Sequence, residues 1–126
     1  MRFDIAAPSE VRRGEPVPVT LRVTNTAERP LTIYLQGRPT AFDIIVKNEA
    51  GAVVWRRLEG QTITAILGVR TLEPGQTLAF EDLWPQRDGA GRAVPPGLYE
   101  ISGALPTDGP EPLMTPATRI RILPAP

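Results

Sequence analysis

The 126-residue chain contains no cysteine and no histidine. Without cysteine it can form neither a disulfide nor a thiolate metal site. Without histidine it lacks the commonest metal ligand and the usual general base near neutral pH, which excludes Ser-His-Asp and Cys-His catalytic sites. We therefore expect a protein that is not an enzyme, with no catalytic residues, no metal and no other cofactor.

The chain also has no excess of either charge, since it contains 14 basic and 14 acidic residues. It has no basic footprint of the kind that nucleic-acid binding needs, so we expect no nucleic-acid partner. No run approaches the roughly 20 apolar residues of a membrane span, and residues 1–7 hold no apolar stretch of signal-peptide length. These features predict a cytoplasmic protein; the alternative is an exported protein from which a signal was trimmed.

What the chain does contain is a repeated strand pattern. Over Val17–Thr24, valine and leucine occupy every second position, which is typical of a half-buried strand. Pro18 falls on the outward set, so this strand is expected at a sheet edge or to start at this point. As an exposed edge it could pair two chains.

Shorter apolar alternations recur along the rest of the sequence, and Pro-Gly pairs at 74–75 and 96–97 mark turns between them. Residues 61–72 are rich in β-branched side chains but alternate poorly. No segment has a helical period. Eight or so short strands predict one all-β domain over residues 1–126, a sandwich or barrel of antiparallel strands. We expect two antiparallel sheets and no parallel pair, because no crossover helices are available.

Three aromatic residues are candidates for structural roles. Tyr99 follows the turn at Pro96-Gly97, where Greek-key sandwiches place a tyrosine whose hydroxyl bonds to backbone a few residues upstream. The alternative is a core ring with its hydroxyl in water. Trp84 shares a phase with Leu78 and Phe80, which predicts a core position. Trp55 precedes two arginines, so it is either a core residue or an exposed interface residue.

Several short motifs follow one another in a fixed order: Val23-Thr24-Asn25-Thr26, Phe42-Asp43-Ile44, Gly51-Ala52-Val53-Val54-Trp55, Leu72-Glu73-Pro74-Gly75, Trp84, Pro96-Gly97-Leu98-Tyr99 and Gly103. Their order and spacing, over residues 17–105, resemble the intracellular proteinase inhibitor (BsuPI) family. The resemblance implies an Ig-like β-sandwich that inhibits an intracellular subtilisin-like serine protease. It supplies no site motif that can be carried onto this chain.

Residues 108–116 are the first candidate for a protease contact. Prolines, including Pro112 and Pro116, flank the apolar pair Leu113 and Met114. A stiff, extended loop of this kind lowers the entropy cost of docking, and subtilisin-type proteases favour large apolar residues at the cleavage position. The alternative is that this loop folds Leu113 and Met114 over the end of the core.

Residues 85–96 are the second candidate, with Arg87 or Arg92 as the anchor for a protease that prefers basic residues. A different class of function also stays open: a non-inhibitory Ig-like binding or adhesion module, cytosolic or exported. The fold alone does not choose between these functions.

Overall fold

The computed structural model describes all 126 residues, and its regular elements are eleven strands without a helix. No helix long and apolar enough to cross a membrane is therefore present. The strands are β1 (Arg2–Ala6), β2 (Glu10–Arg12), β3 (Val17–Thr24), β4 (Leu31–Gln36), β5 (Asp43–Lys47), β6 (Val53–Arg56), β7 (Leu67–Leu72), β8 (Thr77–Trp84), β9 (Gly97–Leu105), β10 (Leu113–Met114) and β11 (Thr118–Leu123).

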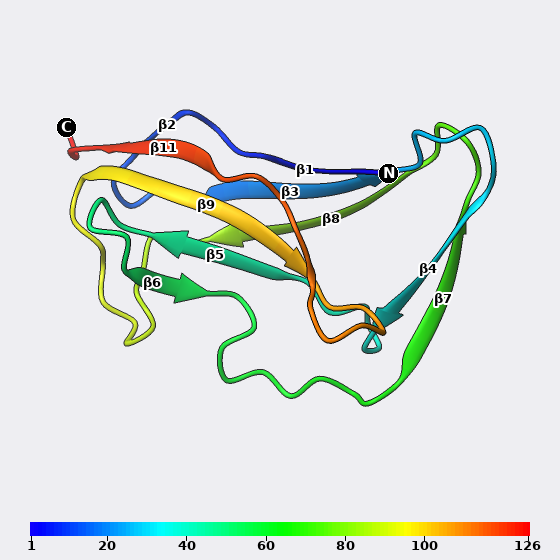
Figure 1. Ribbon diagram of the computed structural model, residues 1–126. Coiled ribbons are helices and arrows are strands. Elements are labelled where there is room, and N and C mark those ends of the chain that lie inside the picture. Colours follow the sequence, from blue (N-terminus) through cyan, green and yellow to red (C-terminus); the bar gives the residue numbers. More distant parts are fainter.

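Two sheets pack face to face (Figure 1). One has the strand order β1-β3-β8, and the other β2-β11-β9-β5-β6, with β10 added along β9. The apolar positions of β3 face those of β5, β9 and β11. Alternate residues of β3 and β11 are buried, whereas in β5 the four residues Asp43 to Val46 are all buried. The prediction of an all-β, Ig-like sandwich is confirmed.

Three details of the prediction are wrong. The strands form three hydrogen-bonded sheets instead of two, because β4 and β7 pair only with each other and leave the sandwich at one end (Figure 1). Strand β3 is central, since β1 and β8 pair with its two sides, so it is not an exposed edge that could pair two chains. The other expectation for Pro18 is confirmed, because it lies at the start of β3, before the part that β1 covers.

The third error concerns parallel pairing. Strand β2 runs parallel to β11 over three residues, from Glu10–Arg12 against Arg121–Leu123. No crossover helix is needed, because nearly the whole chain lies between these two strands and serves as the connection. The N-terminal segment changes sheets between β1 and β2, after Ala6, so that it adds to both sheets in turn.

The two sheets lie close together at Gly103 in β9. A Cβ atom at this position would lie 2.3 Å from Cδ2 of Leu21 on the opposite sheet, which is closer than carbon atoms can approach. Leu21 is fully buried. Glycine at position 103 is therefore required for β3 and β9 to pack at this distance.

An aromatic cluster fills the end of the core near β6. Trp84 is fully buried, 6.4 Å from the half-buried Trp55 and 5.5 Å from Tyr99 between ring centroids. The indole N–H of Trp84 donates to the carbonyl of Arg87 at 3.0 Å. The Tyr99 hydroxyl donates to the carbonyl of Pro95 at 2.5 Å, four residues upstream. The indole N–H of Trp84 and the hydroxyl of Tyr99 thus each have a hydrogen-bond acceptor while the rings are buried.

At the other end of the core, Asn25 forms hydrogen bonds where β4 and β7 diverge from the two packed sheets. Its side chain is fully buried; Nδ2 donates to the carbonyls of Arg29 and Leu72, and Oδ1 accepts from the amide of Ala27. Its backbone bonds to Gly75 and Gln76 in the turn before β8. One residue therefore links the end of β3, the approach to β4, the end of β7 and the approach to β8.

Tyr99→Phe should lower the free energy of unfolding by roughly 1–3 kcal/mol, because the substitution leaves the Pro95 carbonyl without its donor. Chemical denaturation of the two proteins at pH 7 measures this difference. Equal stability would mean that water replaces the hydroxyl at no cost.

The same pair of proteins gives a pH test. Burial, and then the nearby charge of Glu49, raise the pKa of Tyr99 above its usual value of 10.0. A raised pKa means that the stability contributed by Tyr99 is fully present below pH 10 and is lost as the pH rises through the folded pKa. The stability difference between wild type and Tyr99→Phe should therefore shrink above pH 10.

Candidate functional site

The first predicted contact segment, residues 108–116, lies in the hairpin that follows β9. We call residues 106–116 the tip. Leu113 and Met114 pair with Leu105 and Ala104 of β9. Leu113 packs against the core, whereas Met114 is 50% exposed. Pro112 and Pro116 are both exposed on either side of this pair. Of the two apolar side chains, only Met114 is free to enter a pocket of another protein.

The residue after Met114 holds the tip to β9. Thr115 is buried; its amide donates to the carbonyl of Gly103, and its hydroxyl oxygen accepts from the amide of Gly103 at 2.8 Å. The backbone of the tip is therefore already hydrogen-bonded along one side where the apolar pair stands.

The second predicted segment, residues 85–96, is a compact hairpin in which Asp88 accepts from the amides of Ala90 and Arg92. These two bonds, that from Arg92 first, lower the pKa of Asp88 against the opposing effect of desolvation. Arg87 donates to the carbonyl of Gly91 within the same hairpin. Both arginines are exposed, but the Arg92 side chain makes no hydrogen bond within the protein, so it is the freer of the two to bind a partner.

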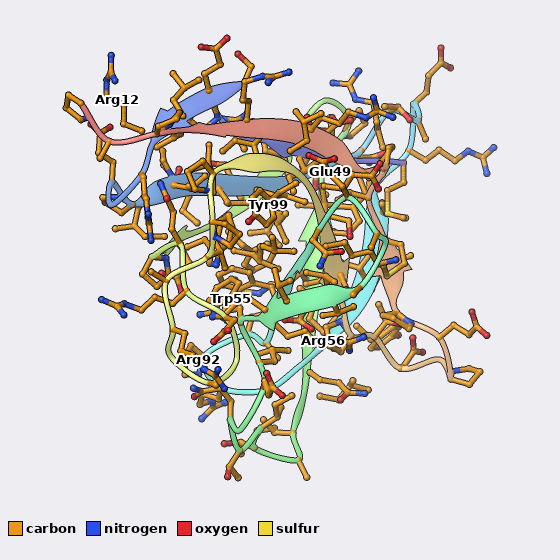
Figure 2. The ribbon with its side chains drawn as sticks, turned by 90° about the vertical axis from the view of Figure 1, so that its left-hand side faces the viewer. Arg12, Glu49, Trp55, Arg56, Arg92 and Tyr99 are labelled. Carbon is orange, nitrogen blue, oxygen red and sulfur yellow. The ribbon has the colours of Figure 1, made fainter.

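The two predicted segments lie at opposite ends of the sandwich, so one docking event cannot engage both. In Figure 1 the tip lies beside the end of β4 at the right, while residues 85–96 descend at the left. Figure 2 views the left-hand end, where Arg92, Trp55 and Tyr99 face the viewer. The tip is joined to β4 by a bridge between Leu35 and Thr107.

A third segment has a longer run of consecutive unpaired backbone amides than either predicted loop. We call residues 61–66, the end of the connection between β6 and β7, the strap. All six residues are exposed, and the backbone amides from Thr62 to Ala65 donate no hydrogen bond. The strap forms backbone hydrogen bonds only at its ends. The amide of Gln61 donates to the carbonyl of Leu58, and the amide of Ile66 to the carbonyl of Thr64. The carbonyl of Ile66 accepts from the amide of Gly37.

Arg57 fixes the first end of the strap to the body. Its Nε donates to Asp82 of β8 at 2.7 Å, and its Nη1 to the carbonyl of Phe42 at 2.8 Å. The guanidinium also lies 3.7 Å from the centroid of the Phe42 ring. Arg57 thus joins the β6 edge of one sheet to the β8 edge of the other, just before the strap begins.

Desolvation opposes ionisation of Asp82, but the hydrogen bonds from Arg57 and the Leu83 amide, with the Arg57 charge, outweigh it and lower the pKa of Asp82. The pair is partly exposed, so its net effect on stability is small. Its role is positional: it sets where the chain leaves the sandwich.

Gly37 fixes the second end. It adopts a φ of +90°, and a Cβ atom there would lie 3.2 Å from Cγ2 of Ile63 and 3.0 Å from the carbonyl oxygen of Pro39. A side chain at this position would therefore push the strap outward. Glycine both allows the turn after β4 and lets the strap pass close over it.

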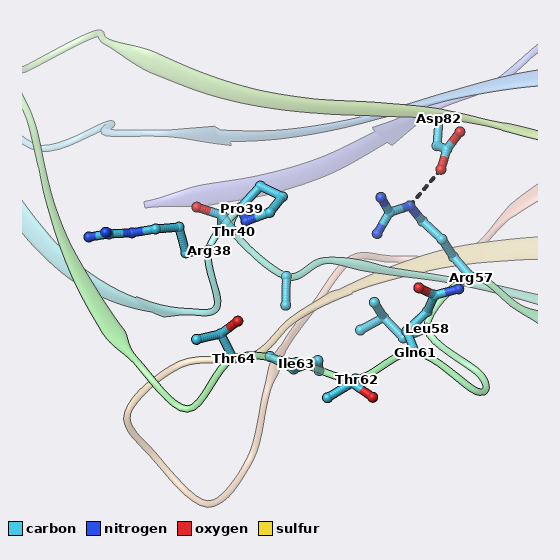
Figure 3. Close-up of a pocket in the computed structure, with 11 residues that line it drawn as sticks. Arg38, Pro39, Thr40, Arg57, Leu58, Gln61, Thr62, Ile63, Thr64 and Asp82 are labelled. Carbon is cyan, nitrogen blue, oxygen red and sulfur yellow. Dashed lines mark hydrogen bonds and ion pairs between the residues drawn. The ribbon is translucent and has the colours of Figure 1, made fainter.

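Between its two ends the strap stands off the body. A pocket of about 380 Å³ separates it from the turn at Arg38–Thr40 and from the Arg57–Asp82 pair. Figure 3 shows Thr62, Ile63 and Thr64 along one side of this space. The strap is thus fixed to the body at both ends, while the backbone amides between these ends are unpaired. A segment with free backbone amides can form hydrogen bonds in the cleft of a protease.

Sequence reasoning did not identify the strap as a site. The poor alternation and frequent β-branched residues of 61–72 were the only available signal. In retrospect this combination fits a chain that favours extended backbone but buries neither face. The anchors, Arg57 and Gly37, come from other parts of the sequence, and no spacing rule connects them to the strap.

These features define an Ig-like β-sandwich with an uncharged, unpaired segment held at both ends. Residues 5–109 match the family described as intracellular proteinase inhibitor, BsuPI. The chain belongs to this family, as the resemblance of its motifs implied. No curated protein matches it.

Solved structures similar to this chain have low sequence identity to it. They include the alkylpurine DNA glycosylase AlkC of Pseudomonas fluorescens bound to DNA, with 13% identity, 96% of this chain and 30% of that chain covered, and a TM-score of 0.51. The CARDB domain of a Pyrococcus furiosus protein, solved with two metal ions, has 10% identity, 96% and 90% coverage, and a TM-score of 0.49. The β-glucosidase EmGH1 of Erythrobacter marinus has 18% identity, 96% and 15% coverage, and a TM-score of 0.48. This chain thus spans less than a third of the length of the glycosylase and of the glucosidase.

The geometry of the tip predicts unequal effects of two neighbouring substitutions. Leu113→Asp should lower the free energy of unfolding by about 2–3 kcal/mol, because it places a charge against the core. Met114→Asp should change it by less than about 0.5 kcal/mol, because that side chain is exposed. Denaturant unfolding of both variants checks this. Equal losses would contradict the assigned orientation of β10.

Proposed function

We propose that this protein inhibits an intracellular subtilisin-like serine protease by laying the strap in the protease cleft. Membership of the proteinase inhibitor family supports the general function, and its description as intracellular supports an action inside the cell. The protease type, the act of inhibition and the contact segment are the proposal.

The observation that carries the proposal is the free backbone of the strap. A protease binds its substrate by hydrogen bonds to an extended backbone, as in strand addition. Four consecutive amides of the strap, Thr62 to Ala65, have no partner within the protein and are open to such bonds. The tip offers the exposed Met114, but its backbone is already bonded to β9 on one side.

The anchors explain why the strap would resist cleavage. Arg57 and Gly37 hold its two ends to the sandwich. Because the ends are ordered before binding, docking costs little conformational entropy. A cut within the strap would leave both new ends held in place, so that the bond could re-form before the fragments part.

The chemistry of the strap favours a cleft with an apolar or neutral pocket. Residues 60–69 carry no charged side chain. A subtilisin-like protease that accepts uncharged residues fits this segment better than one that prefers basic residues. The loop with Arg87 and Arg92 is the matching candidate for the second type.

Three single substitutions to aspartate, one on each exposed segment, test the proposal. Wild type should inhibit a subtilisin-like protease, and Thr64→Asp should weaken inhibition at least tenfold, because it places a charge in the middle of the strap. Met114→Asp should cost less than tenfold, and Arg92→Asp should have no effect. Titration of the protease with each inhibitor gives the inhibition constants.

The outcomes separate the alternatives. If Met114→Asp abolishes inhibition while Thr64→Asp does not, the tip makes the contact, which is the first of the two candidates from the sequence. If only Arg92→Asp weakens inhibition, residues 85–96 make it. No inhibition by wild type, across serine proteases with different specificities, would contradict the proposed function and favour a non-inhibitory binding or adhesion module.

A further inference from the structure

The open edge of β7 is a second surface with the properties of an interaction site. In the β4–β7 pair, Gln36 lies opposite Leu67, so the next pair is Gly37 opposite Ile66. The amide of Gly37 donates to the carbonyl of Ile66 at 2.9 Å. Because hydrogen-bonded and non-hydrogen-bonded pairs alternate in antiparallel strands, Leu67, Val69 and Thr71 direct their amides and carbonyls away from β4.

No other segment bonds to these outward groups. The three residues are uncharged, and Val69 is 59% and Leu67 47% exposed. Tyr34, opposite Val69 on β4, adds an exposed aromatic ring to the same face. The edge therefore combines free backbone groups with an apolar row, and it contains neither proline nor lysine.

The other sheet edges carry features that discourage pairing. Charged residues alternate along the short strands β1 and β2, and two acidic residues lie on the edge strand β8. Prolines flank β10. The hairpin of residues 85–96 covers part of β6, where the amide of Gly89 donates to the carbonyl of Val54. The outer edge of β4 is partly covered by the tip, where the amide of Gln36 donates to the carbonyl of Pro106. The β7 edge has no such cover, and Arg70 is its one charged residue.

We propose that β7 pairs antiparallel with β7 of a second copy, forming a dimer with a continuous sheet β4-β7-β7-β4. This inference does not rest on the inhibitor function. A two-fold axis places one residue opposite itself. With Val69 on the axis, Leu67 lies opposite Thr71, Gly68 lies opposite Arg70, and the outward backbone groups of the two strands meet.

Charge selects this register. With position 70 on the axis, Arg70 would lie directly opposite Arg70 of the second copy, which is unfavourable. With Val69 on the axis, each Arg70 lies opposite a glycine, and Val69 lies beside Val69 of the second copy. This register pairs five of the six residues of β7, Leu67 to Thr71, in both copies. The register with position 70 on the axis also pairs five, but it includes the like-charge pair.

One strand from each copy makes a small contact, below the roughly 1,200–2,000 Å² of a stable interface. We therefore expect a dimer that forms with increasing concentration instead of a permanent one. Sedimentation equilibrium should show dimerisation of wild type as its concentration rises to about 0.5 mM. Val69→Lys should raise the dissociation constant at least tenfold.

Val53→Lys is the matched control, because Val53 is also an exposed valine on an edge strand, at 43% exposure on β6. It should leave dimerisation unchanged. Thermal unfolding of both variants shows whether either has lost its fold. A wild type that stays monomeric at every concentration, with the edge left for another protein, would overturn the proposal. Dimerisation of Val69→Lys as strong as that of wild type would also overturn it.

The absence of cysteine allows a second, register-specific test. Cα atoms of directly opposed residues in a hydrogen-bonded pair are about 5.5 Å apart, within the range that a disulfide spans. Under mild oxidation Val69→Cys should form a covalent dimer, and Thr71→Cys should form at least tenfold less. Equal cross-linking of the two variants, or none of Val69→Cys, would overturn the assigned pairing.

Discussion

The hydrogen bonds of the buried Asn25 side chain are the interaction on which the end of the molecule with β4, β7 and the strap depends. At the corner where β3 and β8 give way to β4 and β7, its amide group bonds to the carbonyls of Arg29 and Leu72 and to the amide of Ala27. These bonds satisfy backbone groups that would otherwise be buried without partners. They hold the β4–β7 pair at a fixed angle to the sandwich, outside both of its sheets.

The strap and the open edge of β7 both result from the separation of β4 and β7 from the two packed sheets. Since β7 has left the sandwich, the chain must cross from β6 to β7 without a neighbouring strand, and this crossing is the strap. For the same reason one side of β7 has no partner. Arg57 and Gly37 then hold the strap at its ends. Unpaired backbone at this end is thus a consequence of how the sandwich is built, and it supplies the groups through which strands of other proteins can bind.

Local patterns were sufficient to predict most strands, because period-two alternation reports burial between two sheets, as in β3 and β11. They could not reveal that β3 is central or that β2 pairs with β11, because such pairings join residues far apart in sequence. The orientation of Leu113 toward the core was open for the same reason. The strap was missed because missing hydrogen bonds define it, and because its anchors act through residues far apart in sequence. Arg57 bonds to Phe42 and Asp82. Gly37 lies against Ile63 and Ile66.

Hydrogen exchange of the protein, alone and mixed with a subtilisin-like protease in a saturated complex, tests the central claim most directly. In the free protein the amides from Thr62 to Ala65 have no hydrogen-bond acceptor and should exchange at close to the rate of an unfolded chain. On binding, this stretch should show the largest slowing in the molecule, while residues 85–96 should stay unchanged. Unaltered exchange of the strap in a saturated complex, with protection elsewhere, would contradict the account.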